Sequence, residues 1–135
     1  MASYDVRPIG HVRSSLKDPA RAPKQGDEGA PDARIEILPA FAAGLDGIGP
    51  GVDVLLLTWL HQADRAVLTV HPRDDRSRPL AGVFGTRSAD RPNPIGIHPV
   101  KVLAVDGLTL TVRGLEAIDG TPVVDLKPVL RSADR

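Results

Sequence analysis

The chain contains no cysteine, which excludes disulfide bonds and thiolate metal sites outright. It also has no apolar run approaching the ~20 residues that a membrane-spanning helix needs. The longest candidate, residues 52–60, is about as long as a strand and includes the charged Asp53. Residues 1–10 contain no apolar stretch of signal-peptide length. These absences together favour a cytoplasmic protein.

An excess of positive charge is missing as well, because 17 Lys and Arg residues are balanced by 17 Asp and Glu residues. Proteins that grip nucleic acid without sequence preference usually show a clear basic excess. Only segment 72–101 is locally basic, with Asp74, Asp75 and Asp90 set against Arg73, Arg76, Arg78, Arg87, Arg91 and Lys101. Two interpretations stay open for this segment: an ordinary solvated face, or a rim that holds a phosphate backbone.

Recognisable metal and nucleophile motifs are also lacking. The four histidines, His11, His61, His71 and His98, have no paired ligand spacing, so we expect no metal site. There is no Gly-x-Ser-x-Gly elbow. The glycines at positions 47, 49 and 51 precede a strand, whereas a dinucleotide-binding loop must follow one, and this argues against a doubly wound sheet.

What the sequence has instead is 13 prolines and 13 glycines, which cut 135 residues into short apolar runs. This pattern is typical of a single all-β domain. Strands are expected over 6–12, 34–38, 52–60, 66–70, 82–86, 99–105, 108–113 and 121–126, with a helical turn over 40–45 and long loops over 15–32 and 74–79. Run 52–60 is continuously apolar, which indicates a strand buried on both faces. Because so many strand edges need partners, we predict a small antiparallel β-barrel or pairing within a homodimer.

Two Asp-Gly pairs mark turns. Asp106-Gly107 lies between two alternating runs and predicts a two-residue hairpin whose central positions both have positive φ. Asp119-Gly120 turns the chain into the last expected strand.

The segment Arg91-Pro92-Asn93-Pro94 is the most unusual in the chain. Each proline drives the residue before it out of the helical region, so the segment is stiff and extended. Gly96 then permits a close approach of the backbone. The segment is either a pre-shaped binding wall or a plain proline-rich loop.

Two further side chains could carry chemistry. Arg87 could hold a carboxylate through two parallel hydrogen bonds, or it could form a surface ion pair. His61 follows the most apolar strand, where it is either a half-buried core residue or part of a pocket, as a hydrogen-bonding group or proton acceptor.

The segment 82–102, GVFGTRSADRPNPIGIHPVKV, resembles the signature of the TrmO (YaeB-like) family. Other stretches agree in the same order: Ile9-Gly10 with Arg13-Ser14, Ala22-Pro23-Lys24-Gln25, His61-Gln62, and the run 119–128. The resemblance covers nearly the whole chain. It implies a small antiparallel β-barrel that forms a homodimer and binds S-adenosylmethionine near the dimer interface. The implied reaction is methylation of N6 of threonylcarbamoyl-adenosine beside the anticodon of tRNA.

Matching the motifs residue by residue gives the implied site. The cofactor contacts would come from Pro23, Lys24, Gln25, His61, Gln62, Arg87, Val100, Asp119, Gly120, Thr121 and Pro122. No catalytic base is identified, and the candidates for acting on the methyl acceptor are His61, Arg87, Arg91 and Asn93. Lys24 stands where the family usually has arginine, which keeps the charge but loses the planar fork. Region 48–53 also lacks the family's frequent Ser-His pair, and larger relatives continue into a C-terminal region thought to help hold tRNA.

Four interpretations therefore stay open: a tRNA base methyltransferase, a methyltransferase for a small metabolite, a module that binds S-adenosylmethionine without turnover, and a purely structural β-domain. Methyl transfer from a sulfonium is an in-line displacement in which the cofactor carries the reactive group. The protein's main task is then to position the acceptor, which fits a sequence without an evident catalytic dyad.

Overall fold

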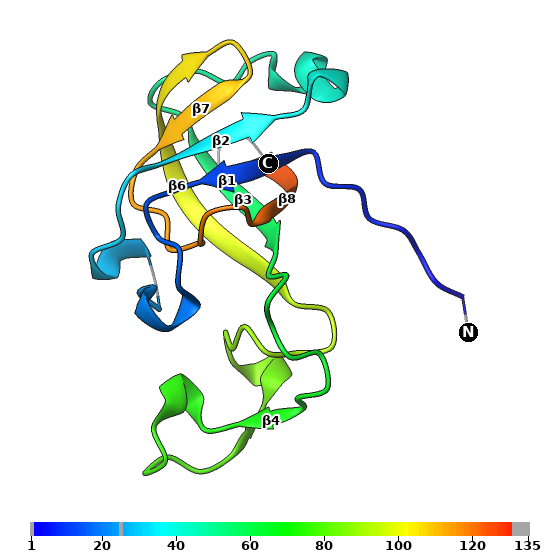
Figure 1. The fold of residues 1–135 in the computed structure, drawn as a ribbon, viewed down its shortest axis with the longest axis vertical. Helices are drawn as coiled ribbons and strands as arrows, with labels where there is room; N and C mark the ends of the chain where they lie inside the picture. Colours follow the sequence, from blue (N-terminus) through cyan, green and yellow to red (C-terminus); the bar gives the residue numbers. More distant parts are fainter. Residues whose placement is uncertain (1, 25, 131–135) are drawn as a thin grey trace.

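The computed structural model describes residues 2–24 and 26–130, and its main body is a closed six-stranded barrel (Figure 1). The hydrogen-bonded order around the barrel is β1 (Gly10–Arg13), β2 (Ala33–Ile37), β7 (Thr109–Val112), β6 (Ile95–Asp106), β3 (Asp53–Trp59) and β8 (Pro122–Pro128). β8 pairs back onto β1, and every pairing is antiparallel. The prediction of an all-β fold of antiparallel strands is confirmed. The homodimer depends on contacts with a second copy of the chain, so it stays a prediction.

Residues 60–94 form a separate lobe beneath the barrel in Figure 1, and we call this segment the loop lobe. It carries a two-stranded sheet of β4 (Thr69–Val70) and β5 (Ala81–Gly82), and the 3₁₀ turns η4 (Pro72–Asp74) and η5 (Val83–Gly85). The Leu60 N–H donates to the Pro94 carbonyl at 2.8 Å, which closes the neck of the lobe. Elsewhere lie the 3₁₀ turns η1 (Pro19–Arg21), η2 (Gly26–Glu28) and η3 (Pro39–Leu45). None of the helices in the described residues is long and apolar enough to cross a membrane.

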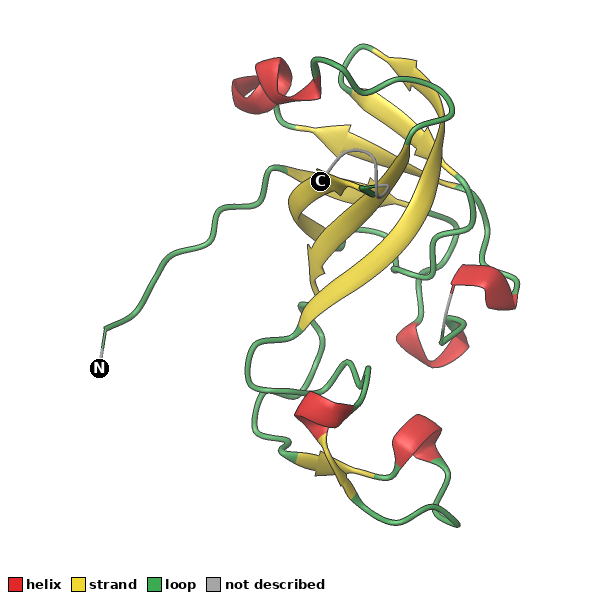
Figure 2. Cartoon of the chain, turned by 180° about the vertical axis from the view of Figure 1, so that it is seen from behind, coloured by secondary structure: helices red, strands yellow, loops and turns green. Residues whose placement is uncertain are grey.

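Alternating apolar side chains fill the barrel, as the two-residue period of a strand requires. In β2 the inward residues Ala33, Ile35 and Ile37 are buried, and the residues between them are exposed. The remaining core residues are Val12, Val54, Leu56, Val100, Val102, Leu110, Val112, Leu115, Ala117 and Val123. β6 is the longest strand, with 12 residues, and it runs from the loop lobe along the full barrel (Figure 2).

The structure corrects the expectation that strand 52–60 is buried on both faces. β3 alternates between buried and half-exposed residues, so Leu55, Leu57 and Trp59 lie on the outer face of the barrel. Only the inward side chains of β3 are fully buried in the described structure. The run 52–60 is continuously apolar because the outward side chains of β3 are apolar as well as the inward ones, although only the inward ones are buried.

The turn between β6 and β7 differs from the one expected at Asp106-Gly107. Asp106 pairs with Thr109, so the β6–β7 turn is formed by Gly107 and Leu108. Gly107 has a φ of 58°, whereas Asp106 is not among the non-glycine residues with positive φ. Glycine at the first loop position is the arrangement of a II′ turn, which needs only one positive φ.

Three expected strands are shorter than predicted because tertiary pairing sets their limits. β1 begins at Gly10 instead of Val6, whose side chain is 56% exposed. β4 covers only the last two residues of the expected strand 66–70. The expected strand 82–86 is mostly the 3₁₀ turn η5, with β5 ending at Gly82.

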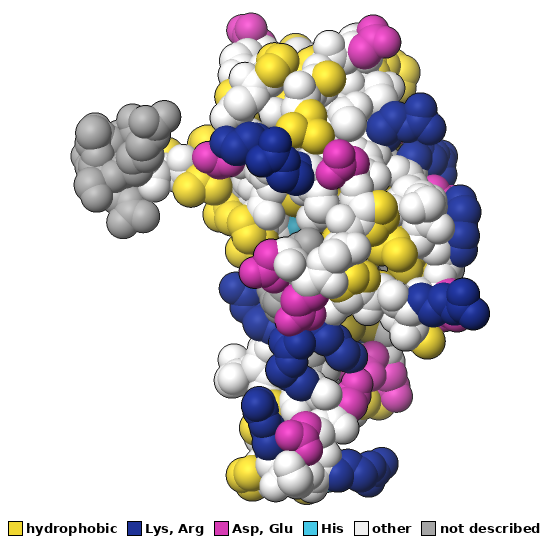
Figure 3. Space-filling view, turned by 90° about the vertical axis from the view of Figure 1, so that its left-hand side faces the viewer, with side chains coloured by type: hydrophobic (Ala, Val, Ile, Leu, Met, Phe, Trp, Pro, Cys, Tyr) yellow, Lys and Arg dark blue, Asp and Glu magenta, His cyan; other side chains and the backbone are white. Residues whose placement is uncertain are grey.

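On the face drawn in Figure 3, charged side chains of both signs are interspersed rather than segregated. Within the locally basic segment 72–101, three cations have acidic partners: Arg73 with Glu28 at 2.7 Å, Arg78 with Asp75 at 3.6 Å, and Lys101 with Asp53 at 3.0 Å. These ion pairs interrupt the positive charge, so segment 72–101 does not form a continuous cationic rim. For most of the segment the interpretation as a solvated face therefore holds.

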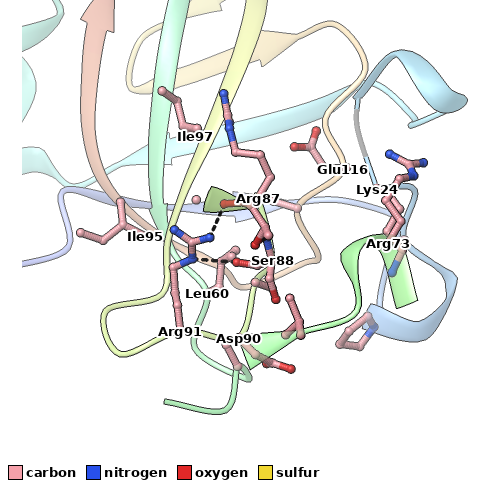
Figure 4. Close-up of a pocket in the computed structure, with 18 of the residues that line it drawn as sticks. Lys24, Leu60, Arg73, Arg87, Ser88, Asp90, Arg91, Ile95, Ile97 and Glu116 are labelled. Atoms are coloured by element: carbon pink, nitrogen blue, oxygen red, sulfur yellow. Dashed lines mark hydrogen bonds between the residues drawn. The ribbon is translucent and has the colours of Figure 1, made fainter. Parts of the chain in front are cut away.

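Arg91 braces the loop lobe from within. Its Nε donates to the Ser88 carbonyl at 2.8 Å, and its Nη2 donates to the carbonyls of Val83 at 2.7 Å and Thr86 at 2.5 Å. Figure 4 shows the guanidinium turned back onto the loop that carries Ser88. One planar group thus joins three carbonyls of the loop, and the Val83 carbonyl also accepts the Thr86 N–H.

We predict that Gly10→Ala destabilises the fold by at least about 1–3 kcal/mol, the usual range for overpacking. A Cβ at Gly10 would clash with the Glu36 carbonyl oxygen and lie 3.1 Å from Ile37 Cα, where β1 pairs with β2. Urea unfolding measures the effect. Gly49→Ala is the matched control, because a Cβ there meets no atom within 4 Å. Equal stability of the two variants would contradict the close approach.

We predict that Arg91→Lys loosens the loop lobe, since an ammonium cannot reach three carbonyls in one plane. Hydrogen exchange of the Thr86 and Ser88 amides should accelerate while exchange in the barrel stays unchanged. Arg76→Lys, at an exposed position of the same lobe, serves as the control. Unchanged exchange in the Arg91 variant would show that the brace is dispensable.

Candidate functional site

A pocket of about 860 Å³ lies between the barrel and the loop lobe. Its volume falls within the range of small-molecule sites. Five segments that are distant in sequence meet there: residues 19–24, 60–63, 70–91, 95–98 and 116–121. Figure 4 shows part of this lining, with Arg87, Arg91 and Ser88 contributed by the loop lobe and Ile95 and Ile97 by β6.

The pocket brings together many of the residues that the motifs single out. The predicted residues in its lining are Pro23, Lys24, His61, Gln62, Arg87, Arg91 and Thr121. His61 is exposed, so its interpretation as a half-buried core residue is wrong. Gln25 lies outside the described residues.

Five predicted residues are not part of this lining. Val100 is only 6% exposed and packs in the barrel core. Asn93 accepts a hydrogen bond from Arg65 at 3.1 Å. Asp119, Gly120 and Pro122 lie at the turn before β8, beside the pocket-lining Thr121. Their cofactor contacts stay predictions.

The turn at Asp119 ties the N-terminal loop to the barrel. Its Oδ1 accepts from the Ser14 N–H at 3.0 Å, and its Oδ2 lies 2.8 Å from Lys17 Nζ. The Lys17 ammonium, followed by the Ser14 N–H, holds the pKa of the Asp119 carboxyl below its ordinary value. Gly120, with a φ of 83°, donates to the Val12 carbonyl at 2.7 Å. The Asp119-Gly120 pair thus holds the N-terminal loop and β1 against the turn that precedes β8.

Two ion pairs fasten the edge of the pocket. Lys24 contacts Asp74 at 2.9 Å, and its hydrogen bond lowers the pKa of the Asp74 carboxyl. Arg73 contacts Glu28 at 2.7 Å. Arg73 and Asp74 have φ values of 55° and 58°, which are uncommon for residues other than glycine. These contacts join η4 to the loop that carries the predicted cofactor residues.

Arg87 differs from the other cations of the lining. Within the described part of the chain, its side chain forms no ion pair or hydrogen bond, so no surface ion pair is seen there. In Figure 4 it extends away from the loop instead of turning back onto it as Arg91 does. Its five N–H donors are therefore available to a ligand.

Sequence reasoning missed a buried chain of polar residues at the pocket. His98 Nε2 lies 2.7 Å from Thr58 Oγ1, and His98 Nδ1 lies 2.5 Å from Glu116 Oε1. His98 and Glu116 both line the pocket. The alternation of β6 would have placed His98 on the inward face together with Val100 and Val102. Glu116 follows β7 in an irregular stretch, and no pattern in the sequence marks it.

Gly96 makes this polar chain possible. A Cβ at Gly96 would lie 2.5 Å from Thr58 Oγ1 and 2.8 Å from His98 Nε2. The close approach predicted at this glycine therefore involves two polar side chains. Over residues 2–24 and 26–130, no group of three or more His, Cys, Asp or Glu side chains is arranged to hold a metal ion.

Comparisons with known proteins identify the family of this chain. The family model of the tRNA-methyltransferase O N-terminal domain matches residues 11–135. The chain is 44% identical, over 99% of its length, to a probable S-adenosyl-L-methionine-binding protein of Archaeoglobus fulgidus, and it spans 36% of that protein. It is 43% identical to a protein of the same name in Methanothermobacter thermautotrophicus, covering 96% of this chain and 92% of the relative.

Solved structures show the same similarity. The crystal structure of TrmO from Pseudomonas aeruginosa matches with a TM-score of 0.76 and 32% identity, over 98% of this chain and 59% of that one. The chain thus spans about three fifths of the TrmO chain. From the family match and the sequence identities together, the chain belongs to the family of the tRNA-methyltransferase O N-terminal domain.

Proposed function

We propose that the protein is an S-adenosylmethionine-dependent methyltransferase that modifies N6 of threonylcarbamoyl-adenosine beside the anticodon of tRNA. Family membership and the names of the relatives support the cofactor and the reaction class. One structural observation carries the proposal for this chain: a single pocket gathers Lys24, His61, Gln62 and Arg87 from three separate segments.

The pocket fits the cofactor in size and in chemistry. S-adenosylmethionine presents a carboxylate, an amine, ribose hydroxyls and a purine. Arg87 has free donors for a carboxylate, and His61 and Gln62 offer exposed hydrogen-bonding groups. Phe84, which is 82% exposed and lines the pocket, offers an aromatic face to a purine. Lys24 would have to exchange its contact with Asp74 for one with the ligand.

The bound cofactor supplies the electrophilic methyl group. The residues of this chain need only hold the acceptor in line with it and keep the site partly shielded from water. No nucleophilic side chain is required, and this agrees with a lining that lacks an activated serine or cysteine. The threonylcarbamoyl group of the acceptor carries a carboxylate, which gives Arg87 a second kind of partner. A tRNA substrate would also place the protein in the cytoplasm.

We also propose that the outer face of β3 and β6 is the homodimer contact. Leu57 pairs with Ile97 and Trp59 with Ile95 across these strands. Ile95 and Ile97 are 46% and 37% exposed, so they form an apolar strip on the outside of the barrel. Both also line the pocket, and a second copy on this strip would complete the wall of the site.

We predict that the purified protein transfers a labelled methyl group to bulk tRNA from a strain that lacks the modification. Arg87→Ala should lower this rate by about tenfold or more, because one charge-assisted contact is lost. Arg76→Ala, an exposed arginine of the same lobe outside the pocket lining, should keep the rate. Label in small metabolites alone would favour the metabolite enzyme, and cofactor binding without any methylated product would favour a binding module.

We predict that the protein has twice the mass of one chain by light scattering, and that Ile97→Glu shifts it toward the monomer. A charge at the strip would be buried without a partner in the dimer. Leu80→Glu, at a position 62% exposed in the loop lobe, should leave the mass unchanged. A monomeric wild-type protein at micromolar concentration would contradict the dimer.

A further inference from the structure

The buried polar chain leads from the barrel interior to the pocket. The Thr58 residue is fully buried, His98 is 4% exposed, and the side chain of Glu116 is 15% exposed. Exposure thus increases stepwise from the hydroxyl through the imidazole to the carboxylate. The carboxylate is the end of the chain that a ligand can reach.

The chemistry of the three groups sets the direction of the hydrogen bonds. An ionised carboxylate only accepts, so His98 Nδ1 carries a hydrogen that it donates to Glu116 Oε1. In a neutral ring Nε2 is then the acceptor, and the Thr58 hydroxyl donates to it. The series of carboxylate, imidazole and hydroxyl is that of a hydrolytic triad, but a hydroxyl with no exposed surface cannot attack a substrate.

The second oxygen of Glu116 faces the pocket. Every buried side-chain nitrogen and oxygen atom in the described residues has a hydrogen-bond partner. Oε2 has no partner among the described residues, so it is not buried, and Glu116 belongs to the pocket lining. One oxygen is therefore anchored by a buried imidazole while the other is presented to a ligand.

The other carboxylates of the lining are held differently. Asp74 pairs with Lys24 and its side chain is 86% exposed. Asp90 accepts the Asp64 N–H at 2.8 Å and ties two parts of the loop lobe together. Only Glu116 among these three is both largely buried and backed by a buried proton-bearing group, so its orientation is the best defined.

Building on the proposed function, we propose that Glu116 accepts the proton that the acceptor nitrogen loses on methylation. The lone pair of an exocyclic nitrogen on a purine is delocalised, so removing its proton assists attack. The nitrogen forms a bond to the methyl carbon, the carbon–sulfur bond breaks with its electron pair going to sulfur, and the N–H proton passes to Glu116 Oε2. His98 and Thr58 are positioning residues that hold the carboxylate. The acceptor nitrogen would thus bind in the pocket beside Glu116.

Glu116→Gln tests this assignment, because the amide oxygen can still accept from His98 while the proton acceptor is lost. We expect kcat for tRNA methylation to fall about 100-fold or more. The affinity for S-adenosylhomocysteine, measured by calorimetry, should change less than about twofold, and Tm should be kept. Glu36→Gln is the matched control, since it makes the same substitution at a carboxylate that is 49% exposed and outside the pocket lining, and it should keep kcat. An unchanged kcat, or a loss of cofactor affinity equal to the loss of rate, overturns the assignment.

His98 gives a second test. His98→Asn places an N–H near the position of Nδ1 and should retain more of kcat than His98→Leu, whereas a merely structural packing role would favour leucine. Equal loss in both variants overturns the positioning role.

A third measurement does not require turnover. With S-adenosylhomocysteine bound, an anticodon stem-loop carrying threonylcarbamoyl-adenosine should shift the NMR signal of the His98 Nδ1 hydrogen. Failure of the proposed function appears as a wild-type protein that methylates no tRNA. Failure of this inference appears as an active Glu116→Gln variant or an unshifted His98 signal, so the two are distinguishable.

Discussion

Closure of the strand ring is the constraint on which the rest of the structure depends. β1 can pair with both β2 and β8 because Gly10 leaves room for the Glu36 carbonyl. Closure fixes the turn at Asp119 against the N-terminal loop, and it aligns the ends of β3 and β6 beside the segment that carries Glu116. Residues from both halves of the chain therefore reach one pocket, although residues 2–24 and 26–130 include no α-helix to position them.

The sequence predicts the class of fold well because the two-residue period is a local property. It shows the strands at about the right places, and it identifies the segments that line the pocket through their family motifs. Strand limits and turn type are less well predicted because they follow from register. The Asp106-Gly107 pair illustrates this, since pairing of Asp106 with Thr109 moves the turn forward by one residue.

Single residues of the site were harder to predict, for physical reasons. Arg87 and Arg91 are chemically identical and four positions apart, yet Arg91 is used up by three backbone carbonyls and Arg87 is free. That difference arises from the path of an irregular loop, which no periodicity encodes. Val100 lies in a matched motif but points into the core, because alternation along β6 gives it the inward side. Glu116 had no sequence signal at all, and only its contact with His98 marks it.

The continuity of β6 has a mechanical consequence. Ile97 and His98 are adjacent on one strand and point to opposite faces, one outward on the apolar strip and one inward to Glu116. Residues 95–101 of β6 are extended and paired with β3, so this segment resists local bending and displacing one neighbour displaces the other. In the proposed dimer, a second copy packed on the outer face of this strand would therefore also hold the imidazole on its inner face, so that assembly and chemistry would be coupled at this point of the chain.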